Sequence, residues 1–68
     1  MKPSQQNHHQ EKILLYEYGD DLELALEESF SREWILVLFS INNNSSYSKE
    51  LIHTIKGWCI VVKTWSNE

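Results

Sequence analysis

The feature that most constrains this chain is an unbroken apolar run from Trp34 to Phe39. In a β-strand, successive side chains point to opposite faces of the sheet, so a strand of this composition needs cover on both faces. Two-sided strands are typical of sheet interiors, and of parallel sheets in particular. We therefore expect a buried strand over residues 33–41.

The chain is small and lacks the usual supports of a small fold. It has 68 residues and a single cysteine, Cys59, and a domain of this size buries only about 60% of the surface that its unfolded chain exposes. One cysteine cannot close an intrachain disulfide, and no Cys/His set has the spacing of a structural zinc site. We expect no cofactor and no metal, which leaves oligomerisation as the route to added stability.

Charge and hydropathy disfavour nucleic acids and membranes as partners. Ten acidic residues against six basic ones give a formal charge of -4, which disfavours direct binding to a nucleic-acid backbone. The apolar run is far shorter than the roughly 20 residues that span a bilayer. Because the start of the chain has no apolar stretch typical of a signal peptide, and the cysteine is single, we expect a cytoplasmic protein whose partner is a protein.

The two ends of the chain differ from its middle. Residues 1–11 and 66–68 are polar and are expected to form a disordered arm and a short tail. Residues 12–18 are rich in strand formers and should form the first strand. Asp20 is then a candidate helix N-cap, with Glu23 three residues later. The helix that follows should bury one stripe, made of Leu22, Ala25, Leu26, Ser29 and Phe30.

The second half of the chain predicts another helix and another strand. Residues 42–46 are Asn and Ser, which favour turns and helix caps. Ser45 or Ser46 is expected to cap a second helix, for which Gly57 provides a C-cap signal. Residues 58–65 are apolar on both sides and should form the last strand.

Together these elements predict a small α/β domain over residues 12–65. The expected order is β-α-β-α-β, with two short helices. Each helix is long enough to connect two parallel strands, so we expect a three-stranded, mostly parallel sheet. A strand order of 1-2-3 leaves one face bare, whereas 2-1-3 places one helix on each face and leaves edges exposed. The expected strands hold far more apolar residues than the helices, so we expect oligomerisation or a partner to complete the cover.

The most charged stretch, residues 17–33, holds seven acids against one base, Arg32. It is either the solvated face of an amphipathic helix or a docking surface for a basic partner. Catalysis by paired carboxylates needs a cleft that raises one pKa, and so short a chain has little room for one. The candidate docking residues are Glu23, Glu27 and Glu28.

The histidines and the cysteine do not indicate catalysis. His8 and His9 lie in the polar arm, and His53 has no evident partner that would orient it as a metal ligand. Cys59 has apolar neighbours, where a thiol stays protonated and behaves as a small hydrophobic group. We expect no catalytic and no metal-binding residues.

Three tryptophans, Trp34, Trp58 and Trp65, are either core residues or binding hot spots, since tryptophan is enriched in both roles. Trp65 is the better hot-spot candidate because it lies near the C-terminus on an expected edge strand that no helix follows. Trp34, in the apolar run, is the second candidate.

The leading hypothesis is a small, non-enzymatic interaction or regulatory protein. It would self-associate, as a homodimer, or dock on a larger protein through an apolar face or edge of its sheet. The alternative is an acidic inhibitor, of the kind made by phages and mobile elements, that uses the first helix to block a basic, nucleic-acid-binding surface.

Overall fold

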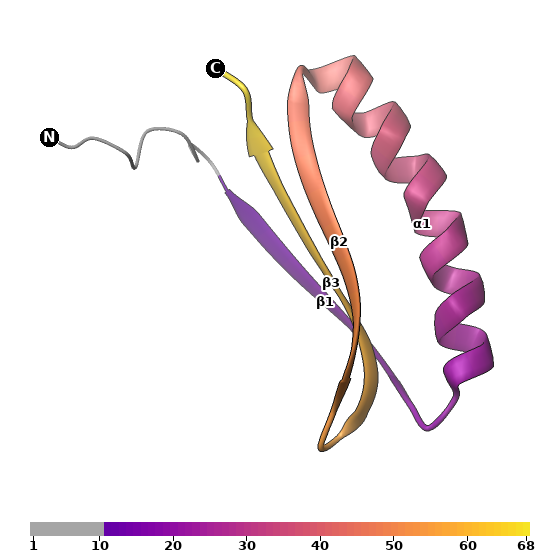
Figure 1. Ribbon diagram of the computed structural model, residues 1–68. Coiled ribbons are helices and arrows are strands. Elements are labelled where there is room, and N and C mark those ends of the chain that lie inside the picture. The colour runs from indigo at the N-terminus through magenta and orange to yellow at the C-terminus, as the bar shows by residue number, and fades with distance from the viewer. Residues whose placement is uncertain (1–10) are drawn as a thin grey trace, which may run out of the picture.

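A computed structural model describes residues 11–68, which form one helix and three strands. Strand β1 spans Lys12–Gly19, helix α1 Leu22–Asn43, strand β2 Ser45–Thr54 and strand β3 Gly57–Ser66. The sheet order is β1-β3-β2, and both strand pairs are antiparallel. Helix α1 lies along one face of the sheet (Figure 1). The expected parallel β-α-β-α-β fold with two helices is therefore wrong.

The expected strand over residues 33–41 is the second half of α1. No glycine or proline interrupts the chain between Leu22 and Asn43, so nothing ends the helix before the apolar run. A short apolar run is compatible with a strand or a buried helix, and its periodicity alone does not separate them. Within this run Leu36 is buried, whereas Trp34 and Leu38 are exposed.

Both ends of α1 are capped by side-chain or backbone chemistry. Asp21, rather than Asp20, is the N-cap, because its carboxylate accepts a hydrogen bond from the Leu24 amide at 3.0 Å. At the other end Asn44 has a left-handed backbone, with φ 49°, and its N–H donates to the Ser40 carbonyl. Asparagine tolerates this conformation better than most residues, so the helix ends here.

Strand β2 takes the place of the expected second helix. Ser45 and Ser46 begin this strand rather than capping a helix. Further along, Tyr47, Lys49 and Leu51 are partly buried, while the residues between them are exposed. This alternation is the two-residue period of a strand with one face against a helix.

The turn between β2 and β3 decides that these strands are antiparallel. Thr54 pairs with Gly57, so residues 55–56 alone connect the two strands. A connection this short joins only antiparallel strands. Gly57 is therefore a turn residue and not a helix C-cap: its φ is +118°, and a Cβ there would lie 2.5 Å from the carbonyl oxygen of Gly19.

Strand β3 is the centre of the sheet and of the core. It confirms the strand expected at residues 58–65, but it is the central strand rather than an edge. Ile60 and Val62 are almost fully buried and form the core with Leu36 of α1. Partly buried residues pack around this cluster; they are Tyr16, Tyr18, Tyr47 and Leu51.

The first half of α1 buries less than its sequence pattern predicts. Ala25 is fully buried, but Leu22, Leu26 and Phe30 are exposed. The buried positions Ala25 and Leu36 are eleven residues apart, which places them on one side of a helix. Leu26 and Phe30 lie around the helix from that side, so the expected stripe is wrong at three of its positions.

The predicted arm and tail lie at the two ends of the chain. Residues 1–10 of the predicted arm lie outside the described residues. In the predicted tail, Asn67 accepts a hydrogen bond from Ser46, and Glu68 accepts one from the Asn44 side chain. No helix within residues 11–68 is long and apolar enough to cross a membrane.

Candidate interaction surfaces

The protein has two layers, and much of its apolar surface is uncovered. Its Cα atoms extend over 42 × 26 × 11 Å, so one helix covers one face of the sheet and nothing in the described chain covers the other. The strand order leaves β1 and β2 as edges. Exposed apolar side chains gather on two surfaces, one on β1 and one on α1.

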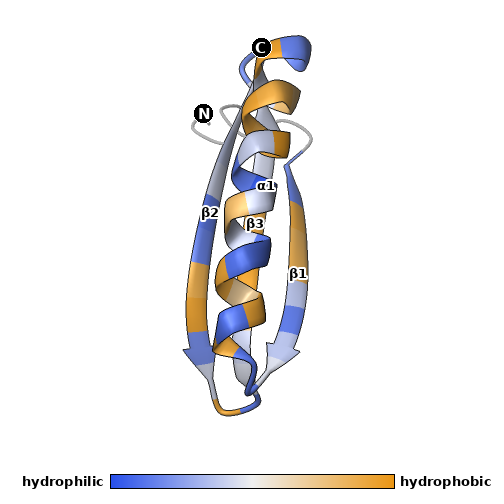
Figure 2. Cartoon of the chain, turned by 90° about the vertical axis from the view of Figure 1, so that its right-hand side faces the viewer, coloured by the Kyte–Doolittle hydropathy of each residue, from blue (hydrophilic) through white to orange (hydrophobic). Residues whose placement is uncertain are grey.

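The first surface, the β1 edge, consists of Ile13, Leu14 and Leu15. These three side chains are 61%, 48% and 56% exposed. Leu14 pairs with the buried Val62 and so faces the helix, whereas Ile13 and Leu15 face the opposite side of the sheet. Figure 2 shows this block in the first half of β1; β2 is hydrophilic over most of its length and has a shorter apolar stretch, Leu51 and Ile52, in its second half.

A groove runs between β1 and α1 on the helix side of the sheet. Its volume is about 280 Å³, and it is mostly apolar. Leu14 and Tyr16 line it from β1, and Ile35 and Phe39 line it from α1. The groove makes the helix-facing side of β1 accessible along much of its length.

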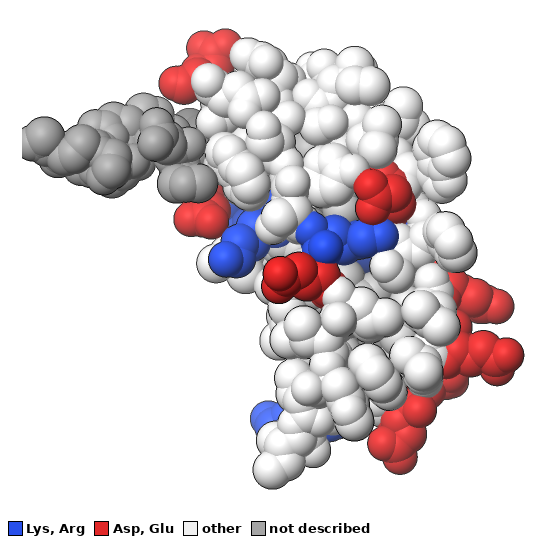
Figure 3. Space-filling view, viewed as in Figure 1, with Lys and Arg blue, Asp and Glu red and all other residues white. Residues whose placement is uncertain are grey.

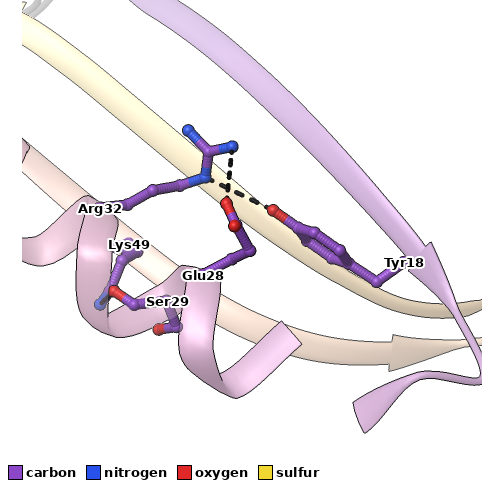
Figure 4. A network of polar contacts seen from close by, with 5 residues as sticks. All are labelled: Tyr18, Glu28, Ser29, Arg32 and Lys49. Carbon is purple, nitrogen blue, oxygen red and sulfur yellow. Dashed lines mark hydrogen bonds and ion pairs between the residues drawn. The ribbon is translucent and has the colours of Figure 1, made fainter. Parts of the chain in front are cut away.

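Arg32 is one of the polar residues that line this groove. Its guanidinium lies 3.5 Å from the centre of the Tyr16 ring and donates to the Tyr18 hydroxyl and the Glu28 carboxylate, each at 3.4 Å. Figure 4 shows Arg32 and Glu28 on α1 reaching toward Tyr18 on β1. Because Arg32 is already engaged by one carboxylate and two phenol rings, it ties α1 to β1.

A second polar cluster ties α1 to β2. Tyr47 donates a hydrogen bond to the Glu33 carboxylate, and the Lys49 ammonium lies 2.9 Å from the same carboxylate and 2.6 Å from the Ser29 carbonyl oxygen. The hydrogen bond from Tyr47, followed by that from Lys49, holds the pKa of Glu33 below its ordinary value. The same bond raises the pKa of Tyr47.

The second surface, which we name the outer stripe, runs along the side of α1 that faces away from the sheet. Successive members are three or four residues apart, so they share one helix face. Its apolar half is Phe30, Trp34, Leu38 and Ile41, which are 76%, 70%, 59% and 70% exposed. Its acidic half is Glu23 and Glu27, both exposed. In Figure 3, acidic side chains gather at the lower right, over the N-terminal half of α1.

The structure distributes the five predicted binding residues over three places. Trp34, Glu23 and Glu27 share the outer stripe. Glu28 turns toward Arg32, and Trp65 lies partly buried on the central strand β3. Their roles in binding stay predictions, but the edge position expected for Trp65 is wrong.

The sequence interpretation missed three members of the outer stripe and the contacts of Arg32. The sequence predicts Phe30 in the buried stripe, and Leu38 and Ile41 in a strand. Continuing the three-to-four-residue spacing from Glu23 past residue 30 is the signal that places them together.

The structure places two of the four residues considered above for metal binding or catalysis, His53 and Cys59. No group of three or more His, Cys, Asp or Glu side chains is placed to hold a metal ion within residues 11–68. His53 stacks on Trp58, with ring centres 4.3 Å apart, and Cys59 is buried. His8 and His9 lie outside the described residues.

No protein-family model, curated protein or solved structure matches this chain.

Proposed function

We propose that this is a non-enzymatic interaction protein that forms a homodimer through the β1 edge. The observation that supports the proposal is an eight-residue edge strand with three consecutive apolar side chains about half exposed. An edge strand presents unpaired backbone N–H and C=O groups, so a long apolar edge favours pairing with another strand. Pairing two copies of β1 satisfies these groups and covers Ile13, Leu14 and Leu15 together.

The other edge of the sheet is built differently. Strand β2 holds Lys49 and Glu50 together with three serines in its first half. Charged and polar side chains on an edge oppose pairing with another chain. The contrast favours β1 over β2 as the edge that binds a second copy.

Pairing along the edge also covers the exposed apolar side chains of β1 better than stacking two bare sheet faces would. Leu14 lies on the helix side and Leu15 on the bare side, so only a contact along the strand covers both. The bare face also holds Glu17, Glu50 and Lys63, which face-to-face stacking would remove from water. Desolvating charged groups opposes association unless each finds a partner.

Charge favours one alignment of the two strands. Antiparallel copies of β1 are related by a twofold axis perpendicular to the sheet, so both helices lie on the same side. An axis at Leu14 sets Glu17 opposite the second copy's Glu11, and like charges directly opposite one another are destabilising. An axis at Leu15 sets Glu17 opposite Ile13 instead. We therefore place the axis at Leu15.

The proposal also includes a cytoplasmic location and a regulatory role. The single cysteine, Cys59, is buried on the central strand, which suits the reducing cytoplasm. We place the protein there, as a regulatory component that acts through binding rather than chemistry.

Sedimentation equilibrium over a wide concentration range tests the dimer. We expect the native protein to be dimeric at micromolar concentration and Leu15→Lys to raise the dissociation constant at least about tenfold, because two lysines then face each other at the axis. Ser48→Lys is the matched control: it adds the same charge on the same sheet face, but on the β2 edge.

Circular dichroism melts establish that both variants are folded. A native protein that stays monomeric at high micromolar concentration contradicts the proposal. So does a Ser48→Lys variant that dissociates as readily as Leu15→Lys.

A further inference from the structure

The outer stripe has an acidic part and an apolar part, and it lies outside the proposed dimer contact. Glu23, Glu27, Phe30, Trp34, Leu38 and Ile41 follow one another at intervals of three or four residues. At 1.5 Å per residue the stripe is about 27 Å long. Its first two members form the acidic half and the other four the apolar half, and no described residue of the chain covers it.

The exposure of the apolar half is unusual for a helix that already has a sheet to pack against. Trp34 is 70% exposed and Phe30 is 76% exposed, although each is large enough to contribute strongly to a core. Contiguous exposed apolar patches mark binding sites, and tryptophan is enriched among the residues that dominate binding. The spacing of the patch is that of a helix docked along another helix.

The acidic half is not explained by helix stability alone. Glu23 lies in the first turn of α1, where a negative charge favours the helix dipole. Glu27 lies beyond the first turn, where that effect has faded. Neither residue takes part in an ion pair among the described residues, in contrast to Glu28, which pairs with Arg32.

We propose that the outer stripe binds an amphipathic helix of a partner protein, one with an apolar segment followed or preceded by basic residues on the same face. Its apolar segment covers Phe30, Trp34, Leu38 and Ile41, and its lysines or arginines reach Glu23 and Glu27. The inference does not rest on the β1 dimer, which uses another surface.

A second copy of this chain matches the stripe less well. Two parallel copies of α1 set Glu23 and Glu27 beside the same acids. In antiparallel copies the acids meet the opposite helix end, and the last turn of α1 holds no basic residue. A second copy therefore covers the apolar half and leaves the acids without partners, whereas a basic amphipathic helix satisfies both halves.

Two synthetic 18-residue peptides test this inference by fluorescence anisotropy. Both have leucines at the spacing of the apolar half; one adds two lysines toward the acidic half, and the other adds two glutamates there. We use the Leu15→Lys protein, so that binding is measured independently of the dimer. We expect the lysine peptide to bind about tenfold more tightly, with an advantage that shrinks in high salt.

Variants of the protein make the comparison specific. The double variant Glu23→Lys/Glu27→Lys should reverse the preference between the peptides, and Trp34→Ala should weaken both. The matched control is Glu17→Lys/Glu50→Lys, with the same charge change on the bare sheet face and an unchanged preference. Circular dichroism verifies that each variant is folded.

Several results overturn the inference. The inference is contradicted if neither peptide binds at millimolar concentration or if both peptides bind equally well. It is also contradicted if the control variant reverses the preference in the same way. If the Leu15→Lys protein still self-associates and Trp34→Ala abolishes that association, the occupant is a second copy and the inference is wrong.

Discussion

Tyr47 donates a hydrogen bond to the carboxylate of Glu33, and this contact joins β2 to α1. The Lys49 ammonium lies 2.9 Å from the same carboxylate. Both partners favour the ionised carboxylate, so the pKa of Glu33 lies below its ordinary value of 4.5. The helix is thereby fixed to one edge of the sheet by a carboxylate whose ionised form the fold favours.

The first prediction concerns acid stability. Because the folded state lowers the pKa of Glu33, its stabilisation is fully present above pH 4.5 and is lost as the pH falls through the lowered pKa. Glu33→Gln should reduce the melting temperature at pH 7, and the difference from the native protein should shrink as the pH falls from 4.5 through the lowered pKa. Thermal melts across this range measure it. Glu50→Gln, an exposed carboxylate with no ion pair in the described chain, should show no comparable difference.

The second prediction concerns the start of α1. Asp21→Ala removes the side chain that accepts a hydrogen bond from the Leu24 amide, and loss of such a cap costs about 1 kcal/mol. Asp20→Ala removes a neighbouring acid without removing that bond and should cost less. Urea denaturation measures the free energy of unfolding of each variant. Equal losses would show that charge, rather than the hydrogen bond, is responsible.

The third prediction concerns the two glycines. Gly57→Ala combines a backbone φ of +118° with a Cβ only 2.5 Å from a backbone oxygen, and we expect a loss of at least about 3 kcal/mol or failure to fold. Gly19→Ala has a φ of +61° and open space around the new Cβ, so it should lose about 1–2 kcal/mol. Denaturation midpoints compare them, and a more harmful Gly19→Ala would contradict this account of the turn.

The fourth prediction concerns the core. Ile60 is fully buried on the central strand, and Ile55 is fully exposed in the turn. Ile60→Val should cost about 0.5–1.5 kcal/mol because it removes a packed methylene. The same substitution at Ile55 should change the free energy of unfolding by less than about 0.5 kcal/mol. A reversed order in urea denaturation would mean that β3 is not the core strand.

Local signals determined part of this fold. The strand at residues 12–18, the helix start near Asp20 and the strand at residues 58–65 follow from strand-forming composition, capping residues and turn residues. The sequence also predicts Trp34, Glu23 and Glu27 as binding residues, but it does not predict that they share one helix face. Their common face depends on whether the helix continues past Phe30, which local composition around residues 31–33 does not decide.

The packing of the elements against one another settles the remaining part of the fold. The apolar run at residues 34–39 is short enough to suit a strand or a helix, and it is helical because α1 continues across the sheet and buries Leu36 against Ile60 and Val62. Because residues 34–39 are helical, β2 is the strand that completes the sheet. The two-residue turn between β2 and β3 makes their pairing antiparallel. With a single helix over one face, the packing leaves the β1 edge and the outer stripe uncovered. The amino-acid pattern shows an excess of apolar residues, and the packing determines where those residues are exposed.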